Sequence, residues 1–266
     1  MTHHLTFTRR VACALLLAAT LPLAAPARAA TKIQHLISPG GIEAWFVQDS
    51  TVPLIAMEYA FAGGAAQDPA DKPGVGNLVA DTMDEGSADL DSKTFHERLE
   101  RRAIDLNFAV TREYLRGSLR MLKDNKEEAF SLLHGALTSP HFDNADVERI
   151  RSQIISGLKR DTTNPNALAG RKFLEMAYGD HPYGKSSWGT LQSVPTITVA
   201  DLKDYVHHVV AKDTLKIAVV GDVDPATLGR LLDQTFGNLP AKSDLVPVLP
   251  MNSAECSIQS SDSNTE

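Results

Sequence analysis

The sequence predicts an α+β fold in which helices cover one face of a largely antiparallel sheet. Strand-like stretches come in neighbouring pairs early in the chain, which is typical of hairpins. Pairs of amphipathic helical stretches follow, and a near-continuous apolar stretch at residues 214–223 predicts a central strand. The 266 residues are 43% apolar and 22% charged, a composition that allows a sizeable core.

The first elements are a hairpin and two helices. Residues 41–50 and 52–64 predict two strands joined by a polar turn. Ser92 can cap a helix over residues 93–103. Between the hairpin and that helix, the stretch 72–90 contains another predicted helix, whose apolar stripe is Val75, Leu78, Val79, Thr82 and Met83.

A second strand pair and the remaining helices complete the pattern. Residues 104–122 alternate in polarity and predict two strands that meet around residues 111–113. Two amphipathic helices follow, at 125–137 and 144–161, and Asn144 can cap the second. After these, residues 164–179 predict a helix with Pro165 in its first turn, and residues 181–197 predict a loop. Residues 199–211 predict a helix capped by Thr198. The apolar strand at 214–223 and a helix over 224–237, begun by Asp224 and Pro225, follow.

Residues 1–29 are typical of a secretory signal peptide. Arg9 and Arg10 precede a short apolar run, and a small-x-small site at residues 27–29 would be cut before Ala30. An uncleaved anchor is the alternative, although the apolar run is shorter than a membrane span. We therefore expect the mature protein to be periplasmic or secreted.

Loss of this segment removes three Arg and no acid, which changes the formal net charge from −7 to −10. An acidic exported protein is not expected to bind nucleic acid. Only Cys256 would remain, so no internal disulfide is expected. Residues 241–266 are rich in Pro, Ser and Asn and predict a linker or a disordered tail.

The common catalytic patterns are absent from the sequence. None of the nine histidines lies in H-E-x-x-H or H-x-x-E-H, and neither a G-x-S-x-G elbow nor a phosphate-binding glycine loop occurs. His134 stands among leucines and is interpreted as a packing residue. Asp84 and Glu85 are interpreted as a solvated helix end rather than an acid–base pair.

Two long segments resemble one known family. In residues 61–87, FAGGAAQDPADKPGVGNLVADTMDEGS, a strand ending in Gly-Gly and a D-P-x-x-K-P-G loop lead into a helix. In residues 181–240, HPYG, Gly-Thr, V-G-D-V and F-G-x-L-P follow in order. Together these segments resemble the pitrilysin/insulinase family of zinc metallopeptidases, which includes the mitochondrial processing peptidases. The resemblance spans residues 32–240 and implies one pitrilysin-like half at 30–240 with two α/β subdomains. Residues 30–165 are its N-terminal part, and residues 166–240 are the start of the second homology region.

The same resemblance implies that the zinc site is degenerate. Asn77, Ala80 and Asp81 have the spacing i, i+3, i+4 and share one helix face. They stand where the family's H-x-x-E-H motif has its first His, its general base and its second His. A third ligand, a Glu of a later helix, would fall near Ser156 or Gly157. We therefore expect neither bound zinc, the family's cofactor, nor catalytic residues in this chain.

The function implied is that of an exported, non-catalytic subunit. Such a subunit would pair with an intact zinc-peptidase homologue and help to form the chamber for a peptide or unfolded protein, which binds extended along a sheet edge. No membrane attachment is expected after signal cleavage. The alternatives are an active zinc endopeptidase with a divergent metal site, and a binding or scaffold remnant truncated after the first half.

Overall fold

The computed structural model describes residues 32–250 and confirms the predicted fold class. Its main sheet has the order β1-β2-β8-β3-β7-β6, and every neighbouring pair is antiparallel except β2 with β8. The predicted signal peptide and Cys256 lie outside the described residues. The strands are β1 (Gln34–Ile37), β2 (Glu43–Gln48), β3 (Leu54–Ala62), β6 (Asp105–Val110), β7 (Tyr114–Leu122) and β8 (Lys216–Gly221), with β4 (Gly86–Ser87) and β5 (Leu90–Asp91) in a separate small sheet.

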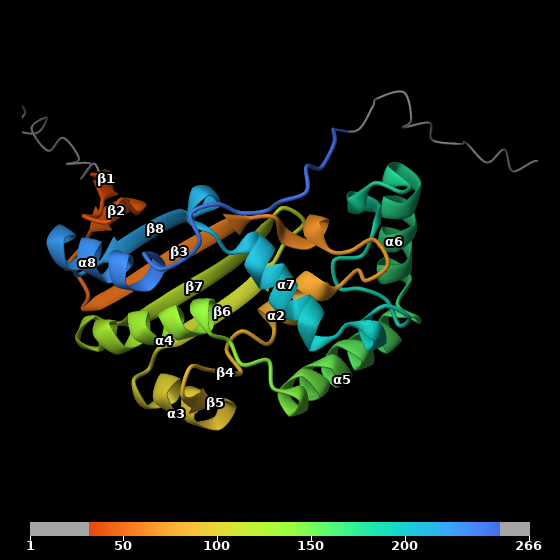
Figure 1. Ribbon diagram of the computed structural model, residues 1–266, viewed down its shortest axis with the longest axis horizontal. Helices are drawn as coiled ribbons and strands as arrows, with labels where there is room; N and C mark the ends of the chain where they lie inside the picture. Colours follow the sequence, from red (N-terminus) through yellow and green to blue (C-terminus); the bar gives the residue numbers. More distant parts are fainter. Residues whose placement is uncertain (1–31, 251–266) are drawn as a thin grey trace, which may run out of the picture. The chain divides into compact units, whose positions relative to one another are not determined.

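The helices follow the predicted order closely. Figure 1 shows α4 and α8 side by side along the sheet, and α7 beside α2. No helix of residues 32–250 is long and apolar enough to cross a membrane. The helices are α2 (Val75–Ala80), α3 (Ser92–Arg101), α4 (Lys126–Thr138), α5 (Asn144–Asp161), α6 (Pro165–Tyr178), α7 (Val199–Val209) and α8 (Pro225–Phe236).

The helices cover one face of the sheet, as predicted. Along β3, buried residues such as Met57 and Phe61 alternate with more exposed ones such as Glu58, because successive strand residues point to opposite faces. The same alternation runs through β7 and β8. The uncovered face exposes the large apolar side chains of Ile37, Trp45, Leu54, Leu122 and Val220.

The predicted central strand is confirmed as β8. It lies between β2, to which it is parallel, and β3, to which it is antiparallel. A chain segment from the second predicted subdomain is therefore built into the same sheet as the N-terminal strands. Residues 63–215 lie between β3 and β8 in the sequence. They contain β6 and β7, which form the far side of the same sheet, and the helices α2 to α7.

Two local expectations need correction, and one strand was not expected. β1 was not predicted, because its half-exposed residues give only a weak alternation. Asp91, not Ser92, caps α3 by accepting from the backbone N–H of Thr94 at 2.8 Å, since the Ser92 hydroxyl donates to Glu85 instead. The N-cap position of α5 is Asp143 rather than Asn144.

A glycine in β7 makes room for the central aromatic cluster. Gly117 pairs directly with Tyr59 of β3, and a Cβ added at Gly117 would lie 2.1 Å from the Cζ of that ring. The Tyr59 ring packs edge-on against Phe61, Phe108 and Phe236, with centroid separations of 5.8 to 6.3 Å. Rings held on several sides cannot retreat cheaply in a close-packed core.

Gly117→Ala is therefore expected to lower the free energy of unfolding by about 1–3 kcal/mol through overpacking. Gly170→Ala is the matched control, since nothing lies within 4 Å of a Cβ added at this position of α6. There the change should raise stability by up to about 1 kcal/mol through helix propensity. Urea unfolding of both variants measures the difference, and equal effects at the two glycines would contradict it.

Candidate functional site

The site is built on α2, a short helix buried between the sheet and two other helices. All six of its residues are buried. The Asp68 carboxylate fixes its start by accepting from the backbone N–H groups of Gly74 at 2.7 Å and Gly76 at 2.8 Å. Burial outweighs these bonds and raises the pKa of Asp68 to about 6.

The helix ends earlier than the sequence predicted. Its last residue is Ala80, and residues 81–84 form turns. The Thr82 hydroxyl donates to the carbonyl oxygen of Leu78 at 2.6 Å, the acceptor that a continuing helix would offer to the N–H of Thr82. That N–H donates to Val79 instead. The predicted apolar stripe is nonetheless buried throughout, from Val75 to Met83.

The three predicted motif positions lie together at the end of α2. The side-chain amide of Asn77 donates to Oδ2 of Asp81 at 3.0 Å, so these two residues are bonded to each other. Burial raises the pKa of Asp81, and the hydrogen bond from Asn77 opposes this. Between them Ala80 is 3% exposed and presents only a methyl group.

Ala80 and Asp81 line a cavity of about 570 Å³ between α2, α5 and β6. Its α5 wall includes Gly157, so of the two positions predicted for the third ligand it is Gly157 that faces the motif. The other candidate, Ser156, is exposed, and its hydroxyl donates back to the carbonyl of Ser152 at 2.8 Å. Trp188 lines the same cavity and is 59% exposed.

Two acids that were interpreted as a solvated helix end lie in this cavity wall instead. Burial raises the pKa of Asp84 to about 6. Glu85 is 7% exposed and lies 2.6 Å from Arg149. Burial opposes its ionisation, but the hydrogen bonds from Arg149 and Ser92 together hold the pKa of Glu85 below its ordinary value. The turn after α2 folds these carboxylates back toward the protein, which a continuous helix would not do.

The residues at the motif positions do not fit a catalytic zinc site. Such a site needs three nitrogen, oxygen or sulfur ligands and an open position. Here Asn77 uses its amide nitrogen on Asp81, and Gly157 offers no side chain. Among residues 32–250, no group of three or more His, Cys, Asp or Glu side chains is placed to hold a metal ion.

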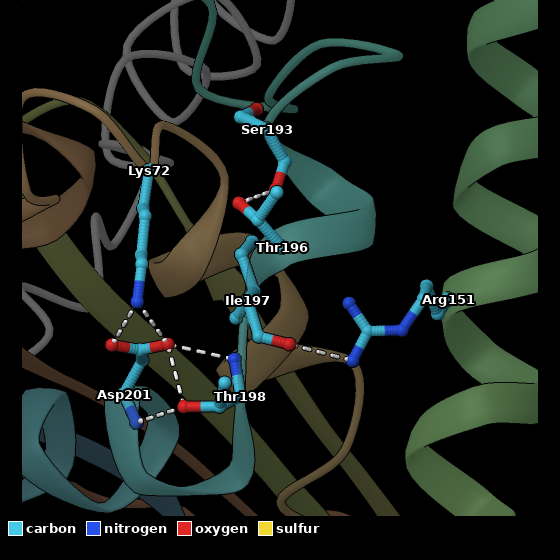
Figure 2. Close-up of polar contacts among 7 residues, drawn as sticks. All are labelled: Lys72, Arg151, Ser193, Thr196, Ile197, Thr198 and Asp201. Atoms are coloured by element: carbon cyan, nitrogen blue, oxygen red, sulfur yellow. Dashed lines mark hydrogen bonds and ion pairs between the residues drawn. The ribbon is translucent and has the colours of Figure 1, made fainter.

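A buried arginine that the sequence pattern did not reveal binds the segment before α7 to α5. Arg151 of α5 is 7% exposed and donates to the backbone carbonyls of Val194 and Ile197, the latter at 2.8 Å. Figure 2 shows this guanidinium reaching the segment that precedes α7. In sequence, Arg151 looks like any charged residue of an amphipathic helix, so no local signal marks it.

The same segment is held from its other side by an ion pair. Asp201 forms the predicted cap of α7 with Thr198, as a capping box, and both its oxygens accept from the ammonium of Lys72 at 2.8 Å. Ser193 donates to the carbonyl of Pro73 at 2.7 Å. The loop before α2 and the segment before α7 are thereby locked together beside the cavity.

Family comparisons agree with this arrangement. A model described as "Insulinase (Peptidase family M16)" matches residues 48–191, more than half of the chain, and "Peptidase M16 inactive domain" matches residues 196–261.

The chain belongs to the insulinase family, peptidase family M16.

Individual M16 proteins are also similar to this chain, each over part of its own length. The non-peptidase homolog YmxG of Helicobacter pylori is 26% identical over 76% of this chain and 45% of its own length. The beta subunit of the mitochondrial-processing peptidase of Saccharomyces cerevisiae is 28% identical over 54% of this chain and 31% of its own. A peptidase M16 inactive domain from Pseudomonas fluorescens superposes with a TM-score of 0.76 at 28% identity, over 82% of this chain and 53% of that one. The chain thus spans about half, or less, of the M16 relatives it matches.

Arg151→Met should lower the free energy of unfolding by about 2–5 kcal/mol, because two buried carbonyls lose charged donors. Arg171→Met, at an exposed position of α6, is the matched control and should change it by less than about 0.5 kcal/mol. Chemical denaturation of both variants gives the comparison. Similar losses at both positions would mean that the contacts of Arg151 with Val194 and Ile197 do not stabilise the fold.

The raised pKa of Asp84 predicts a pH dependence of stability. The folded state holds this proton more tightly than the unfolded state, so the unfolding free energy falls as pH rises from about 4 through about 6. Asp84→Asn should match the wild type near pH 4 and exceed it by up to about 2–3 kcal/mol at pH 7.5. Unfolding curves across this range measure it, with the exposed Asp89→Asn as the control. A pH-independent difference would show that ionisation is not the cause.

Proposed function

We propose that this protein is an exported, non-catalytic M16 subunit that pairs with an active zinc peptidase of the same family and forms part of its peptide chamber. The observation that most supports this is the cavity of about 570 Å³ beside α2, where Ala80 stands at the position expected for the general base. A buried methyl group cannot take a proton from water, so general-base catalysis at this position is lost.

The edge of the sheet supports peptide binding at this cavity. β6 is the last strand of the sheet, so one side of its backbone is unpaired within residues 32–250. Asn107 and Phe108 of this strand line the cavity. An extended peptide could add to β6 as a further strand and place alternate side chains beside α2. The peptide or unfolded segment is therefore the substrate class we assign to the complex.

The uncovered sheet face supports association with another M16 unit. Trp45, Ile37 and Val220 are 59%, 60% and 44% exposed on it, although large apolar side chains usually lie under cover. Structural neighbours of this chain are longer than it is, among them the periplasmic protease PqqL of Escherichia coli, of which the chain covers 25% with a TM-score of 0.73 at 16% identity. Export rests on the predicted signal peptide at residues 1–29.

Two rival functions are weaker. A divergent active peptidase would need a new ligand set, and the described residues offer none around the cavity. A scaffold without a peptidase partner would leave the cavity and the free β6 edge without a use. Both rivals make different predictions from the pairing hypothesis.

The pairing hypothesis is tested by mixing the purified protein with the intact H-x-x-E-H homologue of the same genome. We expect less than about 0.1 zinc per chain by elemental analysis, no peptide cleavage by the chain alone, and cleavage by the mixture at least about tenfold above that of the homologue alone. Zinc near one per chain with chelator-sensitive cleavage would establish the divergent peptidase. Unchanged activity of the mixture would favour the scaffold.

A cavity-filling variant and a surface control show whether the peptide binds in the cavity. Gly157→Phe places a ring in the cavity, where an added Cβ meets only the end of the Arg160 side chain, at 3.7 Å. Gly170→Phe makes the same change on the open surface of α6. Stimulation of the homologue should fall at least about tenfold for the first and stay unchanged for the second. Equal stimulation by both variants would place the peptide elsewhere.

A further inference from the structure

The segment that follows α8 is held by hydrogen bonds to other segments of the protein. Figure 1 shows it, in blue, running from the α8 end of the molecule toward α6. Residues Ser243–Pro250, which we call the strap, contain neither helix nor strand. The backbone bonds of the strap within the described residues all go to other segments, beginning with Asp244, whose N–H donates to the carbonyl of His208 at 3.0 Å.

Gln67 recognises the backbone of the strap at two points. Its side-chain oxygen accepts from the N–H of Val246 at 2.8 Å, and its side-chain nitrogen donates to the C=O of the same residue at 3.0 Å. An amide that pairs with both backbone groups of one residue selects an extended conformation, since a helix would use those groups internally. The contact is independent of the Val246 side chain, which is 70% exposed.

His181 makes the second backbone contact, three residues farther on. Its Nδ1 accepts from the N–H of Tyr183 at 3.1 Å, so in the neutral ring the proton is on Nε2. That nitrogen lies 3.0 Å from the carbonyl oxygen of Leu249 and donates to it. Gln67 and His181 therefore hold the strap at residues 246 and 249.

Burial along the strap repeats every three residues, as do the backbone contacts at residues 246 and 249. Leu245 and Val248 are half-buried, whereas Val246 and Leu249 are 70% and 74% exposed. A polyproline II helix has three residues per turn and no internal hydrogen bonds. Pro247 and Pro250 fix the φ angles that this conformation requires.

The surface that receives the strap is aromatic. The rings of Tyr178, His181 and Tyr183 pack against one another with centroids 4.8 to 6.2 Å apart. Together with Gly63 and Gln67 they form a groove whose remaining side is the strap, and a space of about 600 Å³ between the rings and the strap stays unfilled. Gly63 has φ +135°, and a Cβ there would come within 3.2 Å of Leu245. Aromatic grooves with a few polar groups for the backbone are how proteins bind polyproline II segments.

We propose that this groove is a binding site for a proline-containing polyproline II peptide and that residues 243–250 are its ligand in cis. The bound strap ties three parts of the fold together. Gln67 adjoins Asp68, whose carboxylate fixes the start of α2. Tyr183 donates to the Glu113 carboxylate in the turn between β6 and β7, and its carbonyl accepts from Arg112. When the strap is bound, it therefore restrains the loop before α2 and the turn after β6. Both α2 and β6 line the cavity.

Hydrogen exchange of the full chain tests the binding in cis. Val248→Asn replaces an inward side chain, and Val246→Asn makes the same replacement two residues earlier on the outward side. The first should speed exchange of the hydrogen-bonded N–H groups of Ser243, Asp244 and residue 246 at least about tenfold, and the second should leave it within about twofold of wild type. Gln67→Ala should behave like the first and Gln192→Ala, at an exposed position away from the groove, like the second. Equal effects of the two valine changes, or no effect of Gln67→Ala, would overturn the proposal.

A peptide added in trans tests the ligand class. A fluorescently labelled peptide of residues 243–250 is titrated into the full-length Val248→Asn chain, in which the groove is intact and the strap released. We expect saturable binding at millimolar concentration or below, no binding to the wild type, and at least about fivefold weaker binding when both prolines of the peptide are glycine. Equal affinity for the two peptides, or no binding of either, would show that the groove does not select polyproline II.

Discussion

The double pairing of β8 is the constraint on which the rest of the structure depends. Without β8, the strands β1 and β2 would be separated from β3, β7 and β6. β8 runs antiparallel to β3, so the last residues of β3 and the first residues of β8 lie at the same end of the strands. The first helix after β3 and the last helix before β8 must therefore meet, and α2 does pack against α7. The position of the candidate site follows from this long-range pairing, which also makes the fold one of high contact order.

The degenerate site is packed as core rather than left as a damaged metal site. Side chains arranged for zinc would be poorly satisfied at a buried helix without the ion, because unpaired buried polar groups cost free energy. Here Asn77 and Asp81 satisfy each other, and Ala80 is apolar where it is most buried. On α5, Gly157 leaves the cavity open at the point where a ligand would have entered it. The residues at these positions therefore satisfy one another and leave the cavity open.

Sequence reasoning found most elements of the fold because their signals are local. The capping box of Thr198 and the N-terminal pair Asp224–Pro225 are short patterns that act over one helical turn. It missed what depends on distant partners. The burial of Asp84 and Glu85, the bonds of Arg151 to another segment and the early end of α2 are all decided by tertiary contacts. Counting residues along the chain limited the expected third-ligand position to Ser156 or Gly157. Only the packing of α5 shows that Gly157 is the one that faces the cavity.

The family pattern is recognisable in this chain because its residues have structural roles. In the D-P-x-x-K-P-G loop, Asp68 binds the N–H groups at the start of α2 and Lys72 binds Asp201. Pro73 accepts from Ser193, and Gly74 has φ +103°, which favours glycine. None of these interactions involves a metal or a substrate. The loop therefore holds α2 against α7 through contacts with other residues of the chain.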